Sequence, residues 1–171
     1  MPAGARIRAA MTAVDLIAHF DLQPHPEGGW YRRLHTSGLT VPLDGRSRPA
    51  LTAIVYLLRV GELSRWHRIF SDELWHFYGG APLQLQVADA QLRQVRELRL
   101  GPLTEHGAAP MHAVPAGSWQ AARSCATANG YSLMGCTVAP GFDFADFRLL
   151  ADDAAASAQL RAAWPHYADW L

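Results

Sequence analysis

The stretch from Gly61 to Gly80, GELSRWHRIFSDELWHFYGG, is the part of the sequence from which we predict the fold. Its apolar residues are largely aromatic or β-branched, which favours β-strands. We predict two short strands that join at Ser71-Asp72. Because side chains two positions apart on a strand share a face, His67 is expected on one surface with Arg65 and Ile69.

A histidine and a glutamate in this stretch form the candidate reactive pair. If the second strand folds back beside the first, Glu73 meets His67 across the pair, and Trp75 continues the face of Glu73. A carboxylate next to an imidazole fixes its tautomer, and histidine transfers protons near neutral pH. We predict His67 and Glu73 as catalytic residues. Trp75 and Arg65 are predicted to bind substrate, since arginine suits a phosphate or carboxylate.

Further substrate-binding candidates lie outside this pair. Glu27 sits in a loop rich in proline and glycine, before a predicted strand at residues 30–35, where it could line the mouth of a cavity. Trp119 offers a flat apolar surface for a sugar or an aromatic ring. His76 completes the set, although strict alternation turns it away from Glu73 unless a bulge intervenes.

The remaining pattern predicts short strands between two helices. Thr12 and Asp15 form a capping box, so a helix should start there and end by Phe20 or Leu22. The alanine-rich residues 151–163 predict a C-terminal helix. Further strands are predicted at residues 30–35, 51–58, 83–87 and 95–100, with a loop or edge hairpin at 36–49. Many short strands at such intervals indicate a sandwich or barrel.

Composition and charge restrict the class of protein and its partners. The 171 residues suffice for one domain, which we predict over residues 1–171. Half of the residues are hydrophobic and 18% are charged, which excludes a disordered chain. Fifteen basic residues balance fifteen acidic ones, so we expect no binding to nucleic acid or anionic membranes.

The sequence shows neither a membrane-spanning segment nor a secretory signal. No apolar run approaches the ~20 residues that cross a bilayer. The leader MPAGARIRAAM lacks the long apolar segment of a signal peptide. We therefore expect a cytoplasmic protein.

Several motifs resemble those of a known family. The spacing from Gly61 to Gly80 is similar to the first cupin motif, G-x5-H-x-H-x3-E-x6-G, with Ile69 in place of the second histidine. Residues 115–120, PAGSWQ, are similar to the second motif, P-x-G-x2-H, with Gln120 in place of the histidine. Four separated segments resemble the cupin_5 group, a domain of unknown function (985): HPEGGWYR at 25–32, SRWHRIFSDELWHFYGG at 64–80, VPAGSWQAA at 114–122 and APGFDFADF at 139–147.

This resemblance covers about residues 14–165 and implies a fold. The expected structure is mainly β: a single-domain cupin jelly-roll β-barrel, like that of the dTDP-sugar 3,5-epimerases, with a short N-terminal helix and a C-terminal helix. The resemblance also implies a small-molecule pocket inside the barrel, which we expect to contain Gln120. Cupins of this type often pair, so a homodimer is expected. The group has no assigned chemistry.

Three functions are compatible with these residues. The first is a metal-independent epimerase or isomerase that acts on a carbohydrate-like or anionic metabolite through His67 and Glu73. The second is a binding module that holds a small molecule without converting it. The third is a metal-dependent cupin enzyme with a reduced ligand set, in which His67, Glu73 and Gln120 would bind a divalent metal. We predict no cofactor for the first two.

Overall fold

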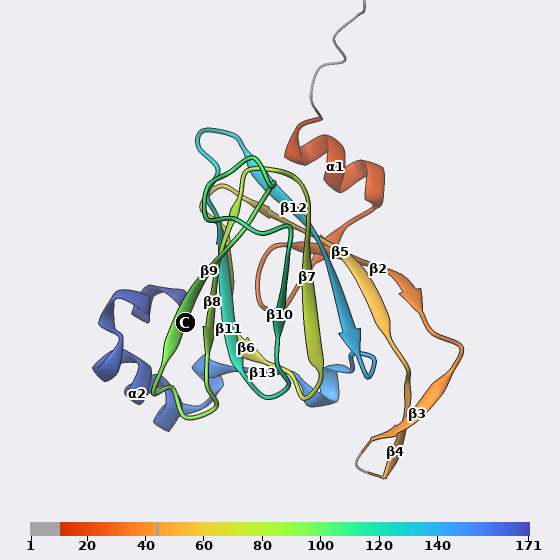
Figure 1. Ribbon diagram of the computed structural model, residues 1–171, viewed down its shortest axis with the longest axis vertical. Coiled ribbons are helices and arrows are strands. Elements are labelled where there is room, and N and C mark those ends of the chain that lie inside the picture. Colours follow the sequence, from red (N-terminus) through yellow and green to blue (C-terminus); the bar gives the residue numbers. More distant parts are fainter. Residues whose placement is uncertain (1–10, 44) are drawn as a thin grey trace, which may run out of the picture.

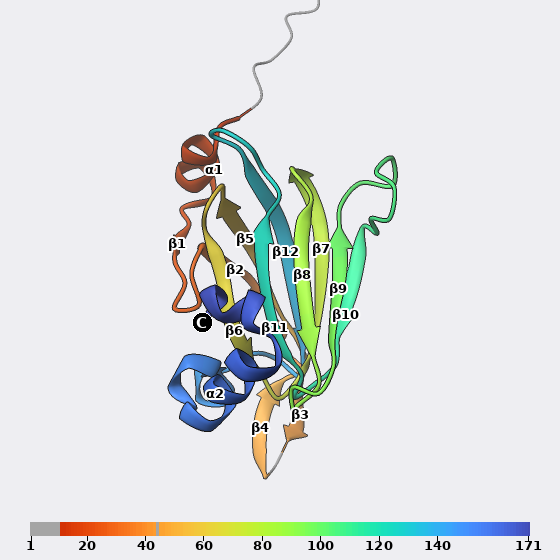
Figure 2. The same cartoon turned by 90° about the vertical axis from the view of Figure 1, so that its left-hand side faces the viewer.

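Two antiparallel β-sheets packed face to face form most of the computed structural model, which describes residues 11–43 and 45–171. The six-stranded sheet has the strand order β1-β2-β5-β12-β7-β10, and the five-stranded sheet has the order β13-β6-β11-β8-β9. In Figure 1, β8, β9 and β11 lie on the left, and β2, β5 and β12 lie on the right. Figure 2 shows the same layers after a quarter turn.

The strands are short, as their sequence pattern predicts. The six-stranded sheet contains β1 (Gln23–Pro24), β2 (Trp30–Thr36), β5 (Thr52–Arg59), β12 (Tyr131–Ala139), β7 (Asp72–Gly80) and β10 (Met111–Val114). The five-stranded sheet contains β13 (Arg148–Leu149), β6 (Leu63–Arg68), β11 (Trp119–Ser124), β8 (Leu83–Ala88) and β9 (Val95–Leu100). A separate hairpin consists of β3 (Thr40–Leu43) and β4 (Arg46–Pro49), and it projects from the sandwich in Figure 1.

Strands that follow each other in the chain often lie in different sheets. β6 pairs with β11 and β13, whereas β7 pairs with β12 and β10. The predicted pairing of β6 with β7, with Glu73 opposite His67, is therefore wrong: the two side chains belong to opposite sheets. The mainly β jelly-roll fold is confirmed. In the described residues its sheets form a sandwich, because no strand ladder joins the two sheets into a closed barrel.

Three apolar clusters hold the layers together. The largest lies between the sheets and includes Tyr56, Trp75 and Leu85, each of which is almost completely buried. A second lies on the outer face of the five-stranded sheet, where Trp66 and Trp119 pack against the C-terminal segment. The third lies under the N-terminal helix. The strand β5 contributes to both faces of its sheet, as its continuous apolar sequence predicts.

A β-bulge in β6 changes which of its side chains face inward. Gln120 of β11 pairs with His67, but Ala122 pairs with Ser64, so β6 has one residue more than its partner between these two pairs. A bulge of this kind reverses the alternation of side chains on one side of it. As a result, Ser64 and His67 both face the space between the sheets.

The two α-helices lie at the ends of the described chain. α1 (Ala13–Phe20) has Thr12 as its N-cap, and Asp15 completes the predicted capping box. α2 (Ala154–Ala163) starts three residues later than predicted, because Asp153 accepts a hydrogen bond from the backbone N–H of Ala156 and caps it there. The 3-10 helices are η1 (Phe144–Asp146), η2 (Leu150–Asp152) and η3 (Pro165–Trp170).

The cap of α1 gives a first prediction. Thr12→Ala removes a hydrogen bond of 3.2 Å from the Asp15 backbone N–H to the threonine Oγ1. The free energy of unfolding should fall by about 1 kcal/mol, measured by urea denaturation. Thr12→Ser keeps the acceptor and serves as the control. Equal losses in the two variants would contradict the capping role.

None of the helices in the described residues is long and apolar enough to cross a membrane. Apart from Met11, the leader on which we based the absence of a secretory signal lies outside the described residues.

Candidate functional site

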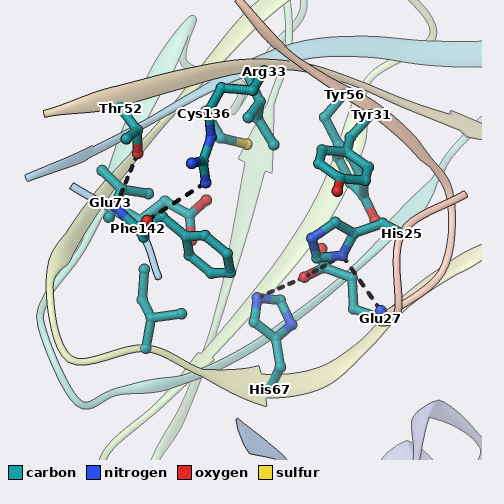
Figure 3. Close-up of a pocket in the computed structure, with 13 residues that line it drawn as sticks. His25, Glu27, Tyr31, Arg33, Thr52, Tyr56, His67, Glu73, Cys136 and Phe142 are labelled. Atoms are coloured by element: carbon teal, nitrogen blue, oxygen red, sulfur yellow. Dashed lines mark hydrogen bonds and ion pairs between the residues drawn. The ribbon is translucent and has the colours of Figure 1, made fainter. Parts of the chain in front are cut away.

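A small cavity between the two sheets brings together the predicted reactive residues. His67 of β6 and Glu73 of β7 line it from opposite sheets, and Glu27 lines it from the loop before β2. The cavity has a volume of about 30 Å³. The remaining lining residues are His25, Tyr31, Arg33, Thr52, Ile54, Tyr56, Ile69, Cys136, Val138 and Phe142. Figure 3 shows ten of the thirteen with labels.

Glu27 lies at the centre of the polar contacts in this cavity. Its Oε2 is 3.2 Å from Nδ1 of His25 and 3.4 Å from Nε2 of His67. Its Oε1 accepts a hydrogen bond of 2.7 Å from the Ser64 hydroxyl. Glu27 is only 6% exposed, and Figure 3 shows the two imidazoles on either side of its carboxylate. The partner that we predicted for His67, Glu73, is therefore replaced by Glu27.

The surroundings of Glu27 favour its ionised form. Burial alone would raise the pKa of this carboxyl, because it disfavours a charge. The positive charges of His67 and His25, together with hydrogen bonds from His25 and Ser64, outweigh burial and lower the pKa of Glu27 to about 2. Glu27 is thus a carboxylate throughout the physiological range of pH.

The surroundings of Glu73 have the opposite effect. Burial raises the pKa of this carboxyl, and the charge of Glu27 raises it further. His67, Gln120 and Cys136 only partly offset these effects. Its Oε2 accepts a hydrogen bond of 2.5 Å from Nε2 of Gln120. Two buried carboxyls in one cavity therefore have pKa values shifted in opposite directions.

The orientation of His67 follows from a backbone contact. Its Nδ1 lies 2.8 Å from the carbonyl oxygen of Arg65. Because a carbonyl only accepts, Nδ1 carries the hydrogen, and Nε2 is the nitrogen that faces Glu27. The ring also stacks on Phe147, with 5.5 Å between the ring centroids. These contacts hold Nε2 at the cavity, against the carboxylate of Glu27.

The loop at residues 25–29 is fixed by β6 and β5. Nη2 of Arg65 donates to the Pro26 carbonyl at 2.6 Å, and the Arg65 backbone N–H donates to the Glu27 carbonyl at 2.9 Å. The Tyr56 hydroxyl of β5 donates to the carbonyl of Gly28 at 2.7 Å. These bonds place the Glu27 side chain against His67 although the two residues are far apart in the sequence.

Close packing at Gly28 gives a second prediction. Gly28 has a φ of +113°, and a Cβ there would overlap the carbonyl oxygen of Leu63. Gly28→Ala should displace the loop that carries Glu27 and reduce the free energy of unfolding by about 1–3 kcal/mol, measured by chemical denaturation. Gly38→Ala is the matched control, since a Cβ there meets no atom within 4 Å. Similar stabilities of the two variants would contradict this role of Gly28.

An aromatic segment covers the two histidines. Residues 141–147 follow β12, and Phe144 stacks on His25 with 5.8 Å between centroids, while Phe147 stacks on His67. This segment is held to the β3–β4 hairpin through Asp146. Its carboxylate accepts from Nη1 of the buried Arg48 at 2.5 Å and from Nη2 of Arg46 at 2.6 Å.

The structure separates the predicted site residues into two groups. His67, Glu73 and Glu27 line the cavity. Gln120 and Trp75 lie behind it, because Oε1 of Gln120 accepts from Nε1 of Trp75 at 2.9 Å while its amide nitrogen donates to Glu73. Both support Glu73 from the core.

Three predicted residues lie away from the cavity. Arg65 binds backbone carbonyls instead of facing the cavity, because the bulge in β6 changes its face. Trp119 is on the outer face of the five-stranded sheet, beneath the C-terminal segment, with the Arg68 guanidinium 4.5 Å from its ring centroid. His76 is on the outer face of the six-stranded sheet, near Tyr78 and Thr137, as strict alternation indicates.

The predicted metal ligands do not fit a metal as they are arranged. Both ends of the Gln120 amide are engaged, with Trp75 and Glu73, and Nε2 of His67 faces Glu27. Within residues 11–43 and 45–171, no group of three or more His, Cys, Asp or Glu side chains is arranged to hold a metal ion. We therefore derive no chemical step through a metal.

Several lining residues were absent from the predicted site. They are His25, Arg33, Thr52, Ile54, Ile69, Cys136, Val138 and Phe142. Two of the segments that carry the family resemblance, HPEGGWYR and APGFDFADF, contain His25 and Phe142. Those segments were the available signal, since both border the cavity in the fold.

Comparison with known proteins identifies the family. The family model described as "Cupin superfamily (DUF985)", Cupin_5, matches residues 14–150. The chain belongs to the Cupin_5 family. Two solved structures are similar to this Cupin_5 protein over nearly their whole length. A hypothetical protein from Leishmania major has 32% identity and a TM-score of 0.80, with 92% of this chain and 95% of that one covered. A protein from Shewanella oneidensis has 32% identity and a TM-score of 0.78, with 94% of both chains covered.

More distant structures share only the fold with this Cupin_5 protein. Oxalate decarboxylase from Bacillus subtilis has 16% identity and a TM-score of 0.53, and the match covers 85% of this chain and 35% of that one. A search of curated proteins finds no match. Function must therefore be argued from the site.

Proposed function

We propose that this Cupin_5 protein is an acid/base enzyme that moves a proton on a small metabolite, as an epimerase or isomerase does. One observation carries the proposal: Glu27 and Glu73 line one cavity, and their pKa values are shifted in opposite directions. Environments that separate two carboxyls in this way are typical of an acid and a base that act together.

Each residue has a role in this proposal. The ionised carboxylate of Glu27 is the base that accepts a proton from the substrate, and His67, whose Nε2 lies 3.4 Å from Oε2 of Glu27, holds this carboxylate in place. Glu73, with its raised pKa, supplies a proton from the opposite sheet. A base and an acid on opposite sides of a carbon atom suit removal of a proton from one face and return to the other. The cavity holds only about 30 Å³, so a substrate must displace lining side chains as it enters.

Hydrogen exchange in heavy water tests the proposal without knowledge of the natural product. Small hydroxy acids, keto acids and sugar phosphates are incubated with the protein, and deuterium at carbon is measured by NMR. We expect the protein to catalyse exchange on at least one class, and His67→Ala to abolish it. Retention of exchange in His67→Ala would refute the proposal. A compound that binds the protein and exchanges no proton would instead indicate a binding module.

We also propose that the protein forms a homodimer through the outer face of the six-stranded sheet. Support comes from Tyr78 of β7 and Met111 of β10, which are 60% and 50% exposed. Both lie beside His76 on a face that α1 covers only over β5 and its neighbours. Exposed apolar side chains on a sheet face are typical of a two-fold interface. Light scattering after size-exclusion chromatography should give twice the mass of the chain, and Met111→Lys should give the monomer. A monomeric wild-type protein would contradict this proposal.

A further inference from the structure

Arg33 stands between the cavity and a large surface cleft. Arg33 and Tyr31 of β2 line both spaces, together with Phe142. The cleft has a volume of about 660 Å³. A molecule large enough to be a metabolite fits the cleft, whereas the cavity admits only a part of it. Any substrate that reaches Glu27 from the cleft therefore passes Arg33.

The guanidinium of Arg33 has no carboxylate partner within 4 Å in the part of the chain that the structure describes. Its neighbours differ in this respect. Arg32 pairs with Asp21 at 3.4 Å, and Arg48 pairs with Asp146 at 2.5 Å. Arg33 thus forms no direct ion pair in the described residues, whereas Arg32 and Arg48 do.

The contacts of Arg33 are weak enough to be exchanged for a ligand. Nη2 donates to the carbonyl of Phe142 at 3.5 Å, which is at the limit for a hydrogen bond. Its guanidinium carbon lies 5.8 Å from the centroid of the Phe142 ring, within the range of a cation–π contact. The Phe142 backbone is itself fixed, because its N–H donates to Oγ1 of Thr52 at 2.9 Å. Figure 3 shows the guanidinium beside Phe142, on the cavity side of β2.

Alternation on β2 explains why Arg33 and not Arg32 faces the cavity. Arg33 pairs with Ile54, which lines the cavity, whereas Arg32 pairs with Val55, which packs under α1. Nη1 of Arg32 donates to the carbonyl of Phe20 at the end of that helix. The two consecutive arginines thus lie on opposite faces of β2, and Arg32 lines the cleft but not the cavity.

We infer that Arg33 binds an oxyanion of the substrate, a carboxylate or a phosphate, and so restricts the site to small anionic metabolites. The guanidinium fork matches either group with two parallel hydrogen bonds. With the oxyanion held at Arg33, the neighbouring carbon atoms extend into the cavity toward Glu27 and Glu73. This inference deepens the proposed function by naming the substrate class, and it rests on that function only for the reaction that follows binding.

Binding of simple anions tests the inference. Malonate and inorganic phosphate are titrated separately at constant ionic strength, with malonamide as the uncharged analogue, and binding is followed by NMR shifts of the backbone amides. We expect at least one anion to shift the amides of Arg33 and Phe142, and malonamide to leave them unchanged. The response to malonate against phosphate shows which oxyanion the site prefers.

Matched variants assign the binding to Arg33. Arg33→Ala should raise the apparent Kd at least about tenfold, the loss expected for hydrogen bonds to a charged group. Arg33→Lys should keep only part of the affinity for the anion, because lysine lacks the guanidinium fork. The control is Arg32→Ala, which removes the same charge from the same strand and should leave the apparent Kd within about twofold of the wild-type value. Equal weakening by Arg33→Ala and Arg32→Ala, binding of malonamide as tight as that of malonate, or no response to either anion would overturn the inference.

The two proposals fail separately. If the proposed proton transfer is wrong and the inference is correct, His67→Ala keeps deuterium exchange unchanged while Arg33→Ala still weakens anion binding. If the inference is wrong and the proton transfer is correct, His67→Ala abolishes exchange while Arg33→Ala binds anions as the wild type does.

Discussion

Glu27→Gln is expected to lower the free energy of unfolding by about 3 kcal/mol at pH 7. The pKa of Glu27 falls from 4.5 to about 2 on folding, and each unit of pKa corresponds to about 1.4 kcal/mol. Because the folded pKa is the lower one, the ionised carboxyl stabilises the fold above pH 4.5. This contribution is lost as the pH falls from about 4.5 to about 2.

The measurement is a set of urea denaturation curves between pH 2 and pH 7. The wild-type protein should lose stability over the acidic range, and Glu27→Gln should lose about 3 kcal/mol less over the same range. Glu105→Gln is the control, because Glu105 forms a more exposed ion pair with Arg99; such pairs contribute about 1 kcal/mol or less. Parallel curves for wild type and Glu27→Gln would show that the carboxylate of Glu27 does not have the proposed partners.

Glu73→Gln is expected to reduce proton exchange on the substrate by about 10²- to 10⁴-fold, the usual contribution of one positioned acid or base. The amide keeps the shape of the side chain and can still accept the hydrogen bond from Gln120. It cannot supply an acidic proton. Loss of exchange in a protein with the wild-type fold would therefore assign the acid to Glu73.

The stability of Glu73→Gln should change in the direction opposite to that of Glu27→Gln. The folded pKa of Glu73 is raised above 4.5, so the group destabilises the fold above its folded pKa, and this penalty decreases as the pH falls from the folded pKa to 4.5. Glu73→Gln should thus be at least as stable as the wild type at pH 7. The control is His76→Ala, which removes a histidine from the outer face of the same strand. Full exchange activity in Glu73→Gln, or equal losses in Glu73→Gln and His76→Ala, would contradict the assignment.

The fold could be predicted because its signals are local. A few neighbouring residues suffice to recognise a run of aromatic and β-branched residues, a glycine turn or the capping box at Thr12. The separated motifs indicated the family. Pairing of strands is not local. The turn at Ser71-Asp72 is compatible with a hairpin or with a crossing from one sheet to the other, and only the packing of the whole sandwich selects the crossing.

The composition of the site could be predicted only in part. His67 and Glu73 occupy positions of the first cupin motif, and Glu27 lies in the segment HPEGGWYR that carries the family resemblance. The face of β6 to which Arg65 belongs depends on a β-bulge that the sequence of β6 does not predict. The contact between Glu27 and His67 depends on a loop that packs against the Leu63 carbonyl at a glycine. Trp119 illustrates the same limit, because an aromatic residue next to Gln120 has equal propensity for either face of its strand.

The attachment of residues 141–147 to the β3–β4 hairpin has a consequence for how such sites diversify. Arg46 and Arg48 of the hairpin bind Asp146. Phe144 and Phe147, on either side of Asp146, stack on the imidazoles of His25 and His67. Insertions or deletions in a projecting hairpin disturb few sheet hydrogen bonds. Changes in the length of the hairpin can therefore move the aromatic segment at residues 141–147 and alter the size of substrate that enters the cavity. The proton-transfer groups of the cavity stay in place.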